Sequence, residues 1–371
     1  MFNYTRFRPW MFVLVFTLVY LAVLFAANHA NPKVFVTLGD CFKQCNANNG
    51  SQCTEDDEGY DGQFAYYIAR DPSDAPDCLD VPAYRYQRIL LPALGRALSL
   101  GQAPLIPWAF VLINLIALVG GTYLLEDLLT AEHIGRWYAL SYGLFVGLVM
   151  GVRLSTSEPL AYGLVIAGIW CGERDHPWSA AILLALAGLT KETTGLFTAG
   201  YLLYWALNRR WWEAIRMGLI VGVPFAVWQI VLYAWLGEFG AGSGGAKASP
   251  FEIVPFLGVL KIGTEGSWAA FIVLGVLLVI PSTVLPTLWA LRNTIRDLRA
   301  KKWELYSCLL LANAAIIPFV PFSTYREFLG LLRFIPGLVL MTVLYSARHR
   351  YRRPLLYSTL WVLLIPFVVS G

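Results

Sequence analysis

Long apolar runs recur from one end of the 371-residue chain to the other, and they constrain its fold more than any other feature. A helix needs about 20 consecutive apolar residues to cross a hydrocarbon core of about 30 Å. Apolar residues make up 57% of the chain and charged residues only 14%, a balance outside the range of soluble, fibrous or disordered proteins. The runs with few charges fall near residues 10–28, 104–124, 137–152, 157–171, 178–190, 193–207, 215–237, 268–291, 304–320, 331–346 and 354–370.

These runs predict an all-α polytopic membrane protein with about 11 transmembrane helices, in which residues 1–371 form a single membrane-embedded domain. The charges of the loops set its orientation, because Lys and Arg favour cytoplasmic loops. With the N-terminus inside, the inner loops hold 16 of the 28 Lys and Arg residues against 8 acids, while the outer loops hold 12 against 16. We therefore predict a multi-pass protein of the cytoplasmic (inner) membrane with a cytoplasmic N-terminus and surrounding membrane lipids as partners. The net charge of +4 gives no indication of a nucleic-acid partner.

The first outer loop, residues 29–103, is much longer than an ordinary connection and is therefore expected to be functional. It contains Cys41, Cys45, Cys53 and Cys78, four of the six cysteines. On the oxidising side of a membrane these residues are disulfide candidates, and the sequence leaves all three pairings open. A zinc site is the rival interpretation, but the paired C-x-x-C spacing of zinc knuckles is missing.

A short helix is expected near residues 60–72, because Phe64, Tyr67 and Ile68 share one helical face and Pro72 ends the run. We expect this helix to lie along the membrane surface with its aromatic side chains in the lipid. Asp61 stands at its start. Its carboxylate either caps the helix or serves as a catalytic group, and one residue can do both.

Arg85 and Arg88 follow in the same loop and are spaced to share a helical face. They either extend toward lipid headgroups or bind an anionic ligand from outside. The second interpretation gains weight because arginine is unfavourable on the outer side.

Two motifs carry a resemblance to a known family: Tyr60-Asp61-Gly62-Gln63-Phe64-x-Tyr66-Tyr67-Ile68-Ala69-x-Asp71-Pro72 and Tyr84-Arg85-x-x-Arg88-x-x-x-Pro92. They resemble bacterial multi-pass glycosyltransferases of the GT-C superfamily, nearest to those called cell-surface glycopolymer formation proteins. More distantly they are similar to dolichyl-phosphate-mannose-dependent mannosyltransferases. The motifs cover about 35 residues; beyond them the resemblance is in hydropathy and loop order.

The resemblance implies a long first extracytoplasmic loop with juxtamembrane helices and an acidic residue of that loop as catalytic base, which falls on Asp61. It also implies a polyprenyl-phosphate-linked sugar donor. The sequence then predicts a hexosyl- or pentosyltransferase that moves a monosaccharide to an extracytoplasmic glycan, lipid or protein acceptor with inversion. Many members have an acidic pair where this chain has only Asp61, so no cofactor or metal is expected, although divalent-cation dependence stays open. The alternatives are a lipid-linked sugar transporter or flippase, and a non-catalytic scaffold for envelope assembly.

Charged and aromatic residues near the predicted outer face complete the candidate site. Lys191 is proposed as a phosphate contact on the strength of the resemblance, with Arg326 and Arg333 as a second choice because a spacing of seven puts them on one helical face. Arg153 and Glu158 are expected to pair, and residues 238–267 to form a flexible extracytoplasmic loop. The predicted substrate-binding residues are Tyr60, Gln63, Arg85, Arg88, Arg153, Glu158, Lys191, Glu192, Tyr325, Arg326 and Arg333.

Overall fold

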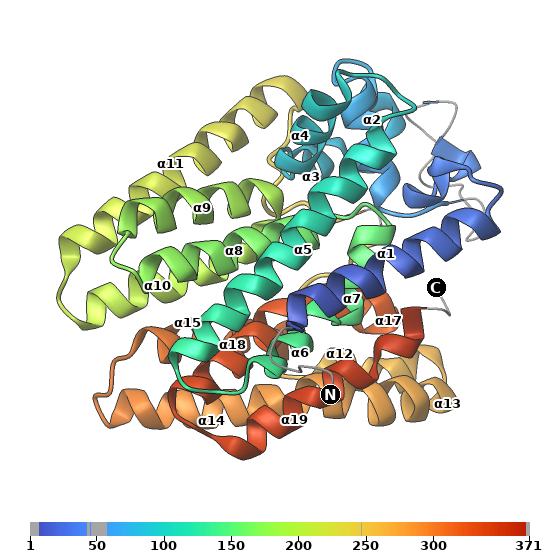
Figure 1. Ribbon diagram of the computed structural model, residues 1–371. Helices are drawn as coiled ribbons and strands as arrows, with labels where there is room; N and C mark the ends of the chain where they lie inside the picture. Colours follow the sequence, from blue (N-terminus) through green and yellow to red (C-terminus); the bar gives the residue numbers. More distant parts are fainter. Residues whose placement is uncertain (1–6, 43–44, 46–57, 246, 369–371) are drawn as a thin grey trace. The chain divides into compact units, whose positions relative to one another are not determined.

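The computed structural model describes residues 7–42, 45, 58–245 and 247–368. Within these residues the secondary structure is helical, apart from two isolated β-bridges, Leu38 with Gly59 and Ala241 with Ser243. Figure 1 labels these helices along the chain, which divides into two compact units. Unit 1 comprises Met1–Leu124, Leu148–Glu192 and Val221–Ala246; unit 2 comprises Leu125–Gly147, Thr193–Ile220 and Lys247–Gly371.

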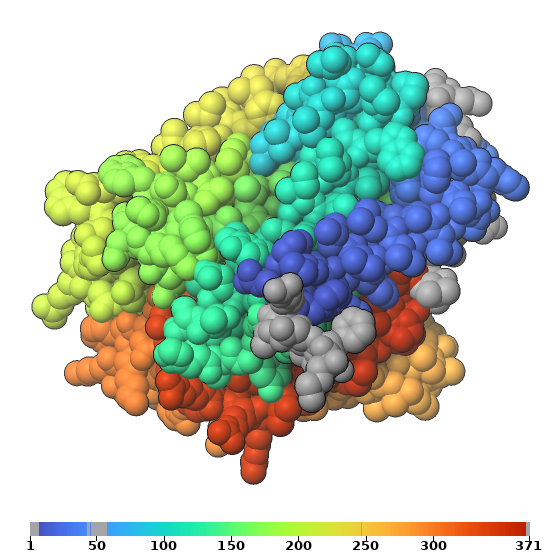
Figure 2. All heavy atoms as spheres, viewed as in Figure 1, coloured from blue at the N-terminus to red at the C-terminus, as the bar shows by residue number. Residues whose placement is uncertain are grey.

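Four helical stretches of the described chain are long and apolar enough to cross a membrane: α1 (Pro9–Ala27), α5 (Ile106–Ala131), α11 (Trp211–Leu236) and the continuous stretch Trp268–Arg299. The last consists of α13 (Trp268–Ala270), the π-helical η8 (Phe271–Val284) and α14 (Leu285–Arg299). A fifth span is possible where α17 (Phe328–Phe334) and α18 (Pro336–Arg348) meet at a bend of 46°. Large apolar side chains of α1, such as Val15, Val19 and Val23, remain exposed, as expected for contact with lipid (blue in Figure 2).

The other apolar runs form shorter helices. They are α8 (Glu158–Gly172), α9 (Pro177–Thr190), α10 (Gly195–Leu207), α15 (Leu305–Ile316) and α19 (Arg352–Leu363). At 1.5 Å per residue each measures about 18–23 Å, less than the hydrocarbon thickness. The run 137–152 is not one helix as expected, because η5 (Arg136–Ala139), α6 (Leu140–Gly143) and α7 (Val146–Arg153) divide it. The structure is that of a helical protein with several potential membrane spans, and it leaves the predicted total of about 11 unconfirmed.

In unit 1, the first long loop folds on a hydrophobic core instead of lying open. Its helix α2 (Gly62–Arg70) buries Phe64, Tyr67 and Ile68 in a cluster with Phe42 and Tyr86. The expectation that these aromatics face lipid is therefore wrong. The periodicity correctly indicated a helix with one apolar face, but that face packs against other parts of the protein.

Apolar side chains of this loop do reach the surface on the next helices. α3 (Pro82–Tyr86) is followed by α4 (Leu90–Ser99), where Leu94 and Leu98 are exposed one turn apart. A disulfide joins Cys45 to Cys78, so the loop is covalently closed around α2. Cys41 is also disulfide-bonded, and Cys53 lies outside the described residues.

Unit 2 is built around α15, which packs against α10, α14 and α18, while α18 also packs against α19. Its remaining helices are short: α12 (Leu257–Lys261) and α16 (Phe322–Arg326), with the π-helical η7 (Ile262–Gly266) after α12. The segment before α12 is held by backbone hydrogen bonds from Glu252 to the Phe319 carbonyl and from Phe256 to the Pro318 carbonyl. Thus part of the predicted flexible loop 238–267 is tied to unit 2.

Candidate active site

Asp61 directly precedes α2 in unit 1, but its side chain does not cap the helix. Its backbone is already helical, and its carboxylate makes no capping hydrogen bond. The next residue, Gly62, packs so closely against the turn after α7 that an added Cβ would lie 1.9 Å from the Leu154 carbonyl oxygen. This close approach fixes the start of α2. The capping interpretation is therefore wrong, and the Asp61 carboxylate is available for another interaction.

That interaction is with Arg85 on α3. The Arg85 Nη1 donates to Asp61 Oδ1 at 2.9 Å, while its Nε and Nη2 donate to the two carboxylate oxygens of Asp80, each at 2.7 Å. The guanidinium is thus held bidentately by one aspartate and directed at the other. It also lies 4.1 Å from the centre of the Phe64 ring, so α2 contributes to its position. The side chain of Asp61 remains one-third exposed, at 33%, whereas those of Arg85 and Asp80 are almost covered.

Arg88 forms a second bidentate ion pair, with Glu192. Its Nε and Nη2 donate to the two carboxylate oxygens of Glu192, at 2.8 and 2.6 Å, and Nη2 also donates to the Tyr84 hydroxyl at 2.6 Å. Burial alone would raise the pKa of Glu192, but the charge and hydrogen bonds of Arg88 outweigh it and lower the pKa to about 2. Burial raises the pKa of Tyr84, despite the nearby Arg88 charge. The tyrosine therefore acts here as a neutral hydroxyl.

Lys191 and Glu158 form the third pair. The Lys191 ammonium donates to Glu158 Oε1 at 2.7 Å, and both side chains are buried. Glu158 is the first residue of α8 and Lys191 follows the last residue of α9, so these two helices bring the pair together. The expected pairing of Glu158 with Arg153 stays a prediction. Arg153, the last residue of α7, interacts with the Tyr20 hydroxyl.

Together these side chains form one charged cluster in unit 1: Asp61, Asp80, Arg85, Arg88, Glu158, Lys191 and Glu192. Its pairs are close enough to influence one another, since the charges of Asp61 and Glu192 both act on Tyr84. The four acids and three bases give a formal charge of −1. Each cation already has a carboxylate partner, a feature that local sequence patterns do not reveal.

The glycine-rich end of unit 1 covers part of this cluster. A Cβ on Gly240 would come within 2.5 Å of the Ala83 carbonyl oxygen, so only glycine allows the segment to approach α3 this closely. A Cβ on Gly245 would lie 3.6 Å from Arg85 Nη2 and 3.7 Å from Asp80 Oδ2. The backbone at Gly245 therefore lies against the Asp80–Arg85 pair, whereas the Asp61 side chain stays partly exposed.

Two predicted substrate-binding residues of the first motif have other positions. Gln63 is completely buried, where its Oε1 accepts from the Gly39 amide and its Nε2 donates to the Glu58 carbonyl. It joins α2 to the preceding chain and does not face the cluster. Tyr60 is partly buried, and its amide donates to the Thr37 carbonyl.

Tyr325, Arg326 and Arg333 belong to unit 2 and form no single helical face. The chain breaks at Glu327, so Arg326 ends α16 whereas Arg333 lies on α17. Tyr325 is buried and donates to the Ile317 carbonyl; Arg326 is exposed beside Glu327. Arg333 is buried. The assumption that Arg326 and Arg333 share one helix is therefore wrong.

Sequence reasoning missed Asp80 and Tyr84 as members of the cluster. Tyr84 was part of the second motif, but its aromatic character gave no indication of its bond to Arg88. Asp80 lies two residues before the proline that begins α3 and is five residues from Arg85, outside the helical spacings that the motif suggested. A search for acids close to both arginines in sequence would have found it.

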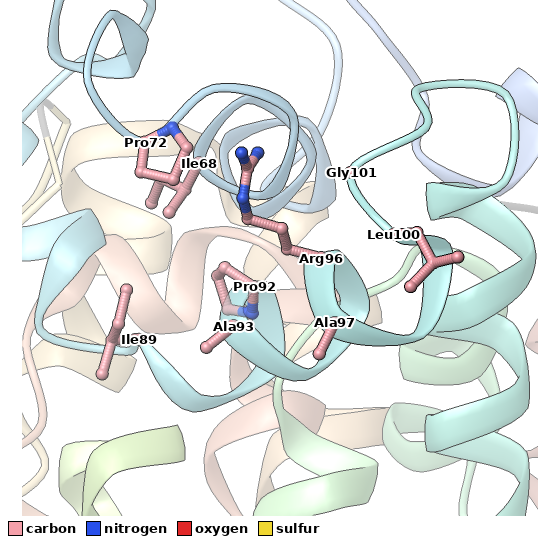
Figure 3. Close-up of a pocket in the computed structure, with 9 residues that line it drawn as sticks. All are labelled: Ile68, Pro72, Ile89, Pro92, Ala93, Arg96, Ala97, Leu100 and Gly101. Carbon is pink, nitrogen blue, oxygen red and sulfur yellow. The ribbon is translucent and has the colours of Figure 1, made fainter.

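An apolar cavity of about 450 Å³ lies beside the same loop in unit 1. Figure 3 shows Ile68 and Pro72 on one side of it and Ile89, Pro92 and Ala93 on the other. Arg96 reaches from α4 to the end of α2, where its Nη1 donates to the carbonyls of Ala69 and Arg70. The arginine thus satisfies carbonyls at the end of α2 and leaves the cavity mainly apolar.

No protein-family model, curated protein or solved structure matches this chain. Within the described residues, no group of three or more His, Cys, Asp and Glu side chains is arranged to hold a metal ion. The carboxylates of Asp61 and Asp80 both bind the guanidinium of Arg85.

Proposed function

We propose that this chain is an integral-membrane glycosyltransferase of the GT-C type, with its site on the extracytoplasmic side of the inner membrane. It transfers a monosaccharide from a polyprenyl phosphate to a glycan, lipid or protein acceptor, with Asp61 as general base. One observation carries the proposal. The Asp61 carboxylate is not used as a helix cap; it is partly exposed and is held by an arginine that a second aspartate fixes in place.

The reaction requires one proton transfer and one exchange of bonds. The acceptor hydroxyl gives its proton to Asp61 while its oxygen forms a bond to the anomeric carbon. The bond from that carbon to the donor phosphate breaks, and the lipid phosphate departs with the electron pair. Attack opposite to the leaving group inverts the anomeric centre. The fixed guanidinium of Arg85 orients the base, since its third nitrogen is directed at Asp61 Oδ1.

Arg85, Arg88 and Lys191 are the candidate phosphate contacts. Because each already has a carboxylate partner, the donor phosphate must replace or share one of these partners. The Arg88–Glu192 fork is the suitable place for exchange, since phosphate and carboxylate both accept two parallel bonds from a guanidinium. The apolar cavity beside α4 matches the chemistry of an isoprenoid chain and supports a lipid-linked donor.

Loss of the base tests this function. Asp61→Asn keeps the size of the side chain but cannot accept the proton, so we expect transfer to fall about 10²- to 10⁴-fold with little change in lipid binding. Purified protein is incubated with a panel of polyprenyl-phosphate sugars and envelope glycans, and the product anomer is determined by NMR. Asp77→Asn is the matched control, because Asp77 is an exposed acid of the same loop.

Two results would contradict the proposal. One is undiminished transfer by Asp61→Asn. The other is the absence of transfer from every donor while the wild-type protein moves lipid-linked sugars across vesicle membranes, as a flippase would. A scaffold would do neither and would instead retain a bound partner protein in both variants.

A further inference from the structure

Unit 2 contains a second cavity, of about 740 Å³, far larger than a single water site. Its walls come from α14, α18, the link that contains Arg350 and Tyr351, and the start of α19. Figure 1 labels these three helices. One part is apolar and aromatic, formed by Leu285, Pro286 and Trp289. The other part is basic, formed chiefly by Arg350, Arg352 and Arg353, with Arg296 beside them. Its volume lies within the range of small-molecule sites.

The basic part differs from the charged cluster of unit 1 in one respect. Among the described residues, no carboxylate forms an ion pair with Arg350, Arg352 or Arg353. The acids of the adjoining segment have other partners: buried Asp297 lies 3.9 Å from Arg296 Nη2 and accepts bonds from the hydroxyls of Ser307 and Tyr345, and Glu304 faces His349. Cations concentrated in a cavity without acidic partners are complementary to an anion.

The arrangement along α14 adds a second constraint. Leu285 and Arg296 are eleven residues apart, which corresponds to about 16 Å along a helix. This is about the thickness of one leaflet of the hydrocarbon core. α14 also ends the long apolar stretch Trp268–Arg299. In a helix that crosses the membrane, this distance would place Leu285 among the acyl chains when Arg296 lies at the level of the phosphate groups.

We propose that this cavity binds an anionic phospholipid, with its phosphate at Arg350, Arg352 and Arg353 and one acyl chain along Leu285 and Trp289. The Tyr351 hydroxyl accepts a hydrogen bond from Arg296 at 2.9 Å and thereby holds that arginine at the rim. On α19, the Tyr357 hydroxyl donates to the Pro281 carbonyl at 2.7 Å and fixes this wall of the cavity. The proposal does not depend on the glycosyltransferase function, since it concerns other residues and no transfer step.

Native mass spectrometry of the full chain in a non-ionic detergent tests the site. Dioleoyl phosphatidylglycerol is titrated against dioleoyl phosphatidylcholine, which has the same chains but no net charge. We expect at least tenfold tighter binding of the anionic lipid. Arg350→Gln with Arg352→Gln is expected to weaken its binding about 30-fold, from the usual contribution of two charges near an anionic headgroup. Arg353→Gln alone, at an exposed side chain, is expected to weaken it about fivefold.

The matched control is Arg292→Gln with Arg299→Gln, which removes two exposed charges from α14 outside the cavity. It is expected to change binding less than threefold. Equal losses in the two double variants would overturn the proposal in favour of a diffuse basic surface. Competition by millimolar inorganic phosphate, with no requirement for acyl chains, would also overturn it by assigning the site to a free anion. If the double variant fails to fold, the result with Arg353→Gln decides.

Discussion

Asp80 has the clearest positioning role at the scale of single residues. It binds Arg85 through both carboxylate oxygens and leaves one guanidinium nitrogen to Asp61. A single aspartate would already neutralise Arg85, but a single contact would let the guanidinium rotate. A proposed base that must meet an acceptor hydroxyl at hydrogen-bond distance depends on such fixation.

Asp80→Asn is expected to lower transfer about 10- to 100-fold, because Arg85 loses one charged fork and no longer orients Asp61. Asp61 itself remains, so the activity is reduced instead of abolished. The measurement is the rate of sugar transfer together with its pH profile. Asp80→Glu, which keeps the charge, is the control and should recover part of the rate. An unchanged rate in Asp80→Asn would rule out the positioning role.

Glu192 gives a prediction about acid stability. Its pKa in the folded protein is about 2, against an ordinary value of 4.5, because Arg88 stabilises the charged form. A lowered pKa contributes stability above pH 4.5, and this contribution is lost as the pH falls through 2. Glu192→Gln imitates the protonated acid, so it should cost about 1–3 kcal/mol at pH 7.

The difference in thermal stability between wild type and Glu192→Gln should therefore narrow between pH 4.5 and pH 2. Intrinsic fluorescence of the protein in detergent measures it. Glu238→Gln, at an exposed acid, should show little difference from wild type at neutral pH. If the difference in thermal stability stayed constant down to pH 2, it would refute the conclusion that Arg88 stabilises the charged form of Glu192.

The sequence predicted most members of the charged cluster but few of its contacts. Asp61, Arg85 and Arg88 were selected from two motifs of the first outer loop, and Lys191 and Glu192 from a charged turn between two apolar runs. Their partners depend on long-range folding: Arg88 and Glu192 are 104 residues apart, and Asp61 and Arg85 are 24 apart. Helical periodicity relates neighbours three or four residues apart and carries no information about such pairs.

At the scale of elements, the position of α2 decides where Asp61 stands. The helix has no side-chain cap, and its start is instead fixed by contact between Gly62 and the Leu154 carbonyl. Its apolar face is inserted in the core of unit 1. The local sequence thus sets the helical conformation, while tertiary packing sets its location and direction.

Gly62→Ala is expected to destabilise the protein by more than about 2 kcal/mol, because a Cβ 1.9 Å from the Leu154 carbonyl oxygen must displace backbone. It should also reduce transfer by shifting Asp61. Thermal unfolding in detergent measures the first effect. Gly188→Ala on α9 is the control: its Cβ has no neighbour within 4 Å, so the higher helix propensity of alanine should stabilise the protein by up to about 1 kcal/mol. Equal effects of the two substitutions would contradict the packing account.

The apolar runs predicted where many helices lie, but they did not predict whether a run forms one helix or several. The run 178–190 became α9, Pro177–Thr190, and the run 193–207 became α10, Gly195–Leu207. The run 137–152 is equally apolar, yet it breaks between α6 and α7 near Leu144. Hydropathy reports the environment of a segment, and both a straight span and two short buried helices satisfy it.

At the scale of the whole molecule, three ion pairs between distant segments each join residues that the sequence assigns to the same side of the membrane. Arg88–Glu192 and Lys191–Glu158 join residues assigned to the outside, and Arg348–Glu132 joins residues assigned to the inside. Each pair lies within one unit. Which of the two groups faces the cytoplasm is a separate prediction, and it rests on the positive-inside bias.

Cysteine labelling tests this orientation. Glu238→Cys, in the predicted outer loop, should react with a membrane-impermeant maleimide in intact cells. Lys302→Cys, in a predicted inner loop, should react only after the cells are opened. Both side chains are exposed. The unmodified chain provides the background from Cys171 and Cys308, which are free thiols. The reverse labelling pattern would place Asp61 on the cytoplasmic side and remove the basis for an extracytoplasmic reaction.

The bond between Cys45 and Cys78 has a consequence for biogenesis. It closes a 33-residue stretch that contains Asp61. By lowering the conformational entropy of the unfolded chain, such a bond stabilises the folded protein by about 3–4 kcal/mol. Newly made protein cannot gain this contribution while its thiols are kept reduced. With the proposed extracytoplasmic position of this loop, the fold around the carboxylate would be completed only after export, and a newly made copy would lack the proposed activity during its synthesis.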